Sequence, residues 1–206
     1  MKNTIDFYDD TARSWADRWY NIETFMPYLK MFMTCLPNNP RIIDLCCGTG
    51  YDSMRLSHLG ARVIGLDLSQ KALEIAKEKN PHLDFYRQNI LQDYSYVGKV
   101  DGILCCAGLI HIKTEELGLA FRQMAKVVRH PGALFLVVYD GMGLREDWRY
   151  ITIDGTDYER LFYRHTLAEL TTASEGLFSF SKELDHAPDE MWRYYIFKAD
   201  VTAKCQ

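Results

Sequence analysis

The chain has 206 residues, of which 48% are hydrophobic, and its formal net charge is −4. This length can bury one sizeable core and leaves little chain for a second, so we expect a single domain over residues 1–206. No block of lysines and arginines occurs, which argues against a large nucleic-acid footprint and against binding to an anionic membrane surface. No run of 18 apolar residues occurs and residues 1–6 lack the apolar core of a secretory signal, so we expect a cytoplasmic location.

Two groups of apolar residues at helical spacing predict two helices within residues 1–38. The first group is Tyr8, Ala12, Trp15 and Trp19, and the second is Phe25, Tyr28, Leu29 and Phe32. These helices precede the rest of the fold and are expected to cover it. The aromatic side chains of the first helix face either the core or a ligand, and their spacing favours the core.

Apolar runs alternate with helical patterns over residues 39–139, which is typical of a parallel sheet wrapped by helices. The first predicted strand begins at Arg41, and the next four are Ala61–Asp67, Leu83–Gln88, Lys99–Cys106 and Ala133–Tyr139. The predicted helices run from Tyr51 to near Gly60, from an N-cap at Ser69 to before Pro81, and from a cap at Thr114.

The last part of the chain departs from this alternation. Residues 140–165 form a polar and aromatic connection, and residues 166–206 contain a helix near Thr166–Ser174 and two β-like runs, Phe178–Glu183 and Trp192–Lys198. A terminal hairpin would place one antiparallel strand in the sheet. The expected fold is therefore α/β and Rossmann-like, with seven mostly parallel strands, one antiparallel strand near the C-terminus and helices on both faces.

The most informative segment is the first strand with the turn that follows it. Gly48 and Gly50 permit a tight turn and a close approach of a ligand. Together these features indicate that residues 39–139 form a nucleotide-binding core, with the binding edge at this turn. A dinucleotide-binding fingerprint would have a third glycine, but Ser53 stands at that position. The turn therefore predicts nucleotide binding but argues against a nicotinamide dinucleotide.

With its neighbours, this turn resembles class I S-adenosylmethionine-dependent methyltransferases. Asp44-Leu45-Cys46-Cys47-Gly48-Thr49-Gly50 is similar to the family's D-L-G-C-G-T-G segment, and Asp67 ends the second strand as the family's ribose-binding acid does. Val100–Ile103 resembles the fourth strand, Arg129–Ala133 the K-P-G-G turn, and Tyr8–Ala12 the Y-D-x-x-A opening of small-molecule members. The resemblance implies S-adenosylmethionine as cofactor, S-adenosylhomocysteine as product and a small-molecule acceptor.

The resemblance also implies which residues contact the cofactor. These are Tyr8, Trp15, Asp44, Cys46, Gly48, Gly50, Asp67, Leu68, Asn89, Ile90 and Cys106. Asp67 would accept both ribose hydroxyls, Leu68 and Ile90 would sandwich the adenine, and Asn89 would meet its edge. Asp44 either contacts the cofactor or supports the turn from behind. Cys46 replaces the first glycine of the turn, so the backbone there must accommodate a Cβ.

Methyl transfer from a sulfonium mainly requires the reacting atoms to be held in line, and a general base helps a hydroxyl or protonated amine acceptor. Candidate bases after the fourth and fifth strands are His111, Tyr139, Asp140 and His165, although His111 could equally be structural. Arg160 and Tyr163 are the substrate-side candidates in residues 140–165. That segment could clamp an acidic or aromatic acceptor, cover the sheet edge or form a dimer contact.

Other features narrow the function further. The pairs Cys46-Cys47 and Cys105-Cys106 lack the spacing of structural zinc sites, so we expect reduced thiols and no metal. Cys106–Leu109 does not resemble the N-P-P-Y motif of enzymes that methylate base amines. The leading hypothesis is a small-molecule methyltransferase, monomeric or homodimeric. The alternatives are a non-catalytic cofactor-binding protein and an NAD-dependent oxidoreductase.

Overall fold

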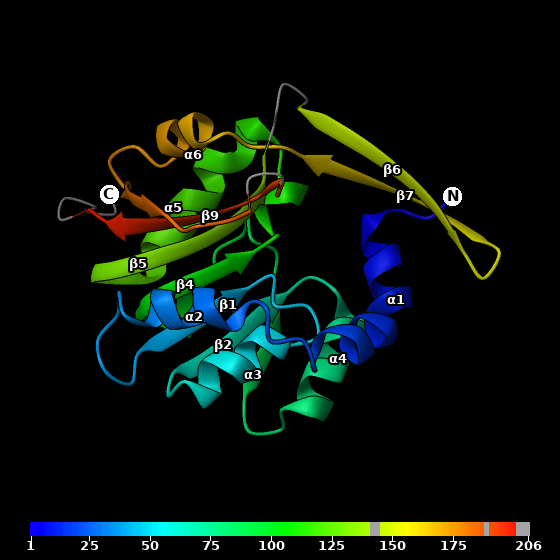
Figure 1. Cartoon of the computed structure of the whole chain (residues 1–206), viewed down its shortest axis with the longest axis horizontal. Helices are drawn as coiled ribbons and strands as arrows, with labels where there is room; N and C mark the ends of the chain where they lie inside the picture. The colour runs from blue at the N-terminus through cyan, green and yellow to red at the C-terminus, as the bar shows by residue number, and fades with distance from the viewer. Residues whose placement is uncertain (141–144, 188–189, 201–206) are drawn as a thin grey trace.

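The computed structural model describes residues 1–140, 145–187 and 190–200, and its centre is a seven-stranded sheet (Figure 1). The strands are β1 (Arg41–Leu45), β2 (Arg62–Asp67), β3 (Asp84–Arg87), β4 (Val100–Cys106), β5 (Val128–Tyr139), β8 (Phe178–Glu183) and β9 (Trp192–Ala199). Their order is β3-β2-β1-β4-β5-β9-β8, and β9 runs antiparallel to both of its neighbours. The predicted Rossmann-like fold is confirmed.

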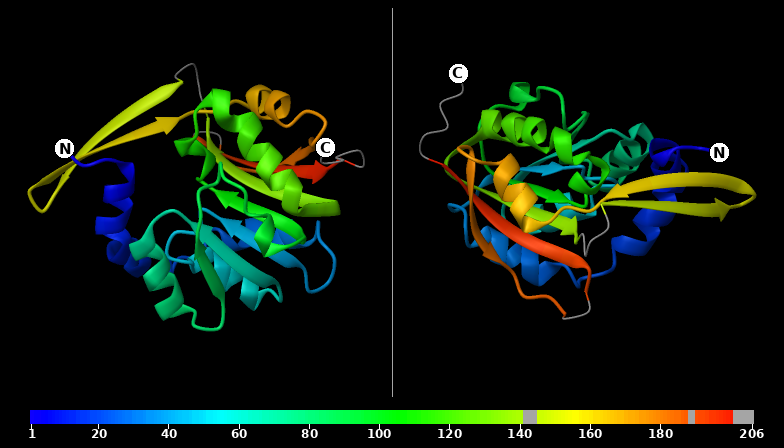
Figure 2. Two further views of the ribbon diagram at one scale, coloured as in Figure 1. Left: turned by 180° about the vertical axis from the view of Figure 1, so that it is seen from behind. Right: turned by 90° about the horizontal axis from the view of Figure 1, so that it is seen from above.

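Helices cover both faces of the sheet, as Figures 1 and 2 show. They are α1 (Thr4–Trp19), α2 (Met26–Met33), α3 (Tyr51–His58), α4 (Gln70–Lys79), α5 (Leu117–Val127) and α6 (Leu167–Ala173), with short 3₁₀ turns η1 (Ser95–Val97), η2 (Leu109–His111) and η3 (Thr114–Glu116). Because successive side chains along a strand point to opposite faces of the sheet, the hydrophobic core has two parts, one on each face. Ile43 points to the side of α5 and α6, whereas Ile42 points to the side of α2 and α3.

Side-chain caps explain where helices α1, α4 and α6 start. The Ser69 hydroxyl accepts a hydrogen bond from the Ala72 amide and caps α4, as the sequence predicts. Thr166 and Glu169 form a reciprocal capping box at α6. Thr114 instead begins the short turn η3, so α5 starts two residues later than a cap at Thr114 would place it.

The connection after β5 contains an antiparallel hairpin, β6 (Glu146–Ile153) and β7 (Thr156–Tyr163), where the sequence analysis expected a loop over residues 140–165. Asp154 and Gly155 join its strands with positive φ values of 49° and 76°, the geometry that Asp-Gly turns favour. The hairpin lies outside the main sheet, beside the N-terminus (Figure 2). Lys2 extends it through two backbone hydrogen bonds of 2.9 Å, one to the carbonyl oxygen of Asp157 and one from the Glu159 amide.

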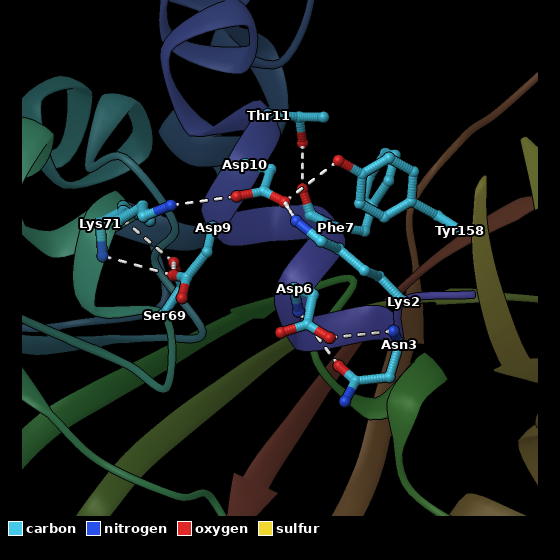
Figure 3. A network of polar contacts seen from close by, with 11 residues as sticks. Lys2, Asn3, Asp6, Phe7, Asp9, Asp10, Thr11, Ser69, Lys71 and Tyr158 are labelled. Carbon is cyan, nitrogen blue, oxygen red and sulfur yellow. Dashed lines mark hydrogen bonds and ion pairs between the residues drawn. The ribbon is translucent and has the colours of Figure 1, made fainter. Parts of the chain in front are cut away.

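Helix α1 bridges this hairpin and α4. Asp10 accepts hydrogen bonds from Lys2 at 2.6 Å, from Lys71 at 3.0 Å and from the Tyr158 hydroxyl at 3.1 Å (Figure 3). Asp9, one residue earlier, accepts from the Ser69 hydroxyl and from the Lys71 amide. The helix is thereby fixed across the edge of the sheet at which β2 ends.

Candidate functional site

The turn after β1 adopts the left-handed backbone conformation at three positions. The φ values are +64° at Cys46, +52° at Gly48 and +80° at Gly50, which is the N-cap of α3. The Cys46 amide donates to the Leu66 carbonyl oxygen at 2.7 Å, so the turn is fixed to the end of β2. A Cβ built on Gly48 would have no atom within 4 Å, so open space lies in front of the turn.

Asp67, at the end of β2, holds this turn. Its Oδ2 accepts a hydrogen bond from the Gly48 amide and its Oδ1 accepts one from the Ser69 amide, both at 2.8 Å. Burial raises the pKa of the carboxyl group, while these backbone donors oppose the rise. Each carboxylate oxygen can accept a second hydrogen bond, so Asp67 remains able to bind a diol.

Asp44 lies behind the turn. Its side chain is buried, with 1% of the residue exposed, and it accepts a hydrogen bond from the Ser53 hydroxyl at 2.6 Å. Burial, followed by the charge of Asp52, raises the pKa of Asp44 to about 8. Ser53, which replaces the third glycine of a dinucleotide fingerprint, is fully buried in this contact. These contacts favour the supporting role of Asp44.

The predicted adenine residues follow β2 and β3. Leu68 is half-buried, and the Asn89 side-chain oxygen accepts a hydrogen bond from the Leu91 amide at 2.9 Å, which leaves the side-chain NH₂ of Asn89 as its donor. Ile90 is only 6% exposed and belongs to the main hydrophobic core. Leu68 and Asn89 therefore offer more surface to a ligand than Ile90 does.

The vicinal cysteines separate onto opposite faces of the sheet, as strand alternation requires. Cys105 packs in the core on the side of α5, whereas the half-buried Cys106 packs on the side of α2. The Cys46 thiol meets Cys105, and this contact together with burial raises the pKa of Cys46 well above its usual range. In the described ranges, no three His, Cys, Asp or Glu side chains are arranged to hold a metal ion.

Helix α1 presents a row of half-buried aromatic side chains beside the turn. Trp15 lies 6.5 Å from Tyr8 and 6.3 Å from Trp19 between ring centroids, and Trp19 stacks on Tyr51 at 6.2 Å. The buried residues of α1 are instead Phe7, Thr11, Ala12 and Ala16. The expectation that the aromatic residues form the core stripe is therefore wrong. The indole Nε1 of Trp19 is buried and has no hydrogen-bond partner within the described residues.

His111, in η2 after β4, meets this aromatic row. Its Nε2 lies 3.1 Å from the Tyr8 hydroxyl, and its ring packs edge-on against Phe162 of β7 with centroids 5.3 Å apart. Burial lowers the pKa of His111 to about 4, so the imidazole is neutral at physiological pH. A neutral imidazole can accept a proton, which is what a general base requires.

The other candidate bases are occupied. The Tyr139 hydroxyl accepts from Arg149 at 3.3 Å and contacts the Met191 sulfur, and Asp140 pairs with Arg193 at 3.1 Å. His165 is buried, and its Nε2 donates to the carbonyl oxygens of η2 residue Leu109 and of Ile112, each at 3.0 Å. His165 therefore ties the segment after β7 to η2.

The hairpin separates the two substrate-side candidates. Side chains alternate between faces along β7, so Arg160 shares a face with the buried Phe162, whereas Tyr163 lies on the other face. Burial raises the pKa of Tyr163, and nearby glutamates of β6 and η3 add to this rise. Arg160 contacts helix α1, because its guanidinium carbon lies 3.9 Å from the Phe7 ring centroid.

Comparisons with known proteins agree with this geometry. Residues 42–132 match the family model described as "Methyltransferase domain". The Bacillus subtilis protein named "Putative methyltransferase YqeM" is 31% identical over 124 residues, which are 58% of this chain and 50% of that protein. This chain thus spans about half the length of the curated relatives it matches first.

Solved structures share the fold over nearly the whole chain. An S-adenosylmethionine-dependent methyltransferase from Clostridium acetobutylicum superposes with a TM-score of 0.75 at 15% identity, covering 94% of this chain and 99% of that one. Magnesium protoporphyrin IX methyltransferase from Synechocystis, solved with bound S-adenosylmethionine, gives 0.68 at 20% identity, covering 95% and 94%. The chain therefore has the fold of these solved structures, and its residues 42–132 are similar to the methyltransferase domain, in agreement with the resemblance.

Sequence reasoning missed several residues of the site. Tyr51 continues the aromatic row beyond Trp19, and Arg149 and Phe162 line the face of the hairpin that carries Arg160. The period-two alternation around the Asp154-Gly155 turn was the available signal for the hairpin and for the face of each side chain.

Among the described residues, no helix is long and apolar enough to cross a membrane.

Proposed function

We propose that this protein is an S-adenosylmethionine-dependent methyltransferase that transfers a methyl group to an oxygen or nitrogen nucleophile of a small molecule. One observation carries the proposal: the left-handed turn at Cys46–Gly50 leaves open space at Gly48, beside the carboxylate of Asp67 at the end of β2. The methyltransferase-domain match over residues 42–132 supports the same class.

The residues around the turn fit the chemistry of this cofactor. Asp67 would accept the ribose hydroxyls, and Leu68 and Asn89 would meet the adenine. The buried indole N–H of Trp19 has no partner in the described ranges and would donate to the cofactor's carboxylate. The half-buried rings of Tyr8 and Trp15 would shield the sulfonium from water and attract it by cation–π interaction.

When bound, S-adenosylmethionine would supply the activated methyl group that an acceptor's lone pair takes, with S-adenosylhomocysteine as the leaving product. His111 is the preferred base because its Nε2 lies 3.1 Å from the Tyr8 hydroxyl. Tyr8 would pass the acceptor's proton to this nitrogen. Tyr139 and Asp140 would have to leave their arginine partners before acting as bases.

The test is an acceptor screen that measures S-adenosylhomocysteine formed from S-adenosylmethionine and a panel of small hydroxyl and amine compounds. At least one acceptor should turn over, and His111→Asn should lower kcat by about 100-fold or more. Binding of the cofactor without turnover of any acceptor would favour the non-catalytic alternative. A cytoplasmic location and a monomeric or homodimeric state remain predictions from the sequence.

A further inference from the structure

The inner face of the β6–β7 hairpin carries an excess of positive charge. The strand register places Arg149 directly opposite Arg160, an arrangement of like charges that is unfavourable without an anion nearby. Asp147 accepts from Arg149 at 2.9 Å and from Arg164 at 2.8 Å. One carboxylate therefore serves two guanidinium groups, and Arg160 is left out of this pairing.

Arg160 has no carboxylate at ion-pair distance among the residues that the structure describes. Its guanidinium carbon lies 3.9 Å from the Phe7 ring centroid and 5.1 Å from that of Phe162. Its Nε is buried and lacks a hydrogen-bond acceptor in the same residues. Cation–π contacts stabilise the half-buried guanidinium, but its buried Nε–H donor without an acceptor remains unfavourable.

Tyr8 lies between Arg160 and the candidate base His111. Burial raises the pKa of Tyr8, while the charge of Arg160 and a side-chain hydrogen bond from it oppose this rise. The same hydroxyl lies 3.1 Å from Nε2 of His111. Arg160 is thus linked through Tyr8 to the candidate base His111.

We propose that the methyl acceptor carries an oxyanion, either a carboxylate or a phosphate monoester, and that Arg160 binds this group. The inference rests on the proposed methyltransferase function and specifies its substrate class. The fork of guanidinium donors matches two oxygens of either group. An anion here would also offset the like charges of Arg149 and Arg160, which the strand register places opposite each other.

The test uses the full chain saturated with S-adenosylhomocysteine and titrated calorimetrically with four ring compounds: benzoate, phenyl phosphate, neutral benzamide and cationic benzylamine. One of the two anions should bind, and comparing them separates the carboxylate from the phosphate. Arg160→Gln should weaken that binding by about 10- to 100-fold, the loss expected for one charge-assisted hydrogen bond, and Arg160→Lys should lose less. Arg62→Gln, an exposed position at the start of β2, is the matched control and should leave the binding unchanged.

Equal anion affinity in the wild type and Arg160→Gln would overturn the proposal, as would binding of benzamide or benzylamine alone, or of none of the four. The affinity for S-adenosylhomocysteine is measured separately and should change less than about threefold in Arg160→Gln. If the wild type does not bind S-adenosylhomocysteine, the proposed function fails. Titrating the free protein with the same anions would then still decide the role of Arg160.

Discussion

Replacing Asp44 with asparagine is expected to make the stability of this protein less sensitive to pH. The carboxyl group is buried, accepts a hydrogen bond from Ser53 and has its pKa raised to about 8 by burial and by the charge of Asp52. In the unfolded chain the same group has its ordinary pKa of 3.8. The folded protein therefore holds a proton that the unfolded chain releases over the whole interval between these two values.

A raised carboxyl pKa stabilises the fold at acid pH, and this contribution is lost as the pH rises towards 8. Each pH unit in this interval lowers the free energy of unfolding by about 1.4 kcal/mol, or roughly 3 kcal/mol between pH 5 and pH 7. Asparagine keeps an acceptor for the Ser53 hydroxyl but does not titrate. Asp52, whose pKa burial raises to about 6, adds a similar slope below pH 6 in both proteins.

The assay is urea unfolding of the wild type and Asp44→Asn at pH 5, 6 and 7. The stability of Asp44→Asn relative to the wild type should increase by about 1.4 kcal/mol for each pH unit. Asp84→Asn, at an exposed position of β3, serves as control and should follow the wild type. If the free energies of unfolding of Asp44→Asn and the wild type fall in parallel with pH, Asp44 is ionised in the fold and the reasoning is refuted.

Three further predictions concern the turn and helix α1. Asp67→Ala should weaken S-adenosylhomocysteine binding by about 1 to 3 kcal/mol in calorimetry, the scale of a lost charge-assisted hydrogen bond, and unchanged affinity would exclude a role in binding. In urea unfolding, Gly50→Ala should lower the free energy of unfolding more than Gly155→Ala does. Both glycines have positive φ, so each variant should lose about 1–2 kcal/mol of stability from backbone strain. Only the Cβ at Gly50 would also lie 3.0 Å from Ala76 and Phe85. Asp10→Asn should speed hydrogen exchange of the α1 amides, because its two lysine ion pairs are lost, and unchanged protection would contradict that role.

Most of the fold could be predicted because its signals are local. The strand-to-turn segment ending at Gly50 and the Ser69 cap each encode their geometry within a few residues, and the structure contains both. The hairpin at Glu146–Tyr163 was missed although Asp154-Gly155 is a local signal too, because polar and aromatic residues alternate there without a continuous apolar run. Which face of the hairpin each side chain occupies, and therefore that Arg160 and Tyr163 lie on opposite faces, can be predicted only once the turn is located.

The site was harder to predict than the fold because its contacts join distant segments. Tyr8 and His111 are 103 residues apart, and the sequence offers no measure of their 3.1 Å separation. Helical spacing placed Tyr8, Trp15 and Trp19 on one side of α1 and favoured a core face over a ligand face. The neighbouring stripe of Ala12 and Ala16 packs against α4, and this leaves the aromatic row half-buried beside the turn.

The measurement that tests the central claim most directly is a calorimetric titration of the purified protein with S-adenosylmethionine, S-adenosylhomocysteine and NAD. The account predicts binding of the first two with micromolar dissociation constants and no binding of NAD. Binding of NAD alone, or of none of the three, would contradict the claim that the turn at Cys46–Gly50 and the carboxylate of Asp67 form an S-adenosylmethionine site.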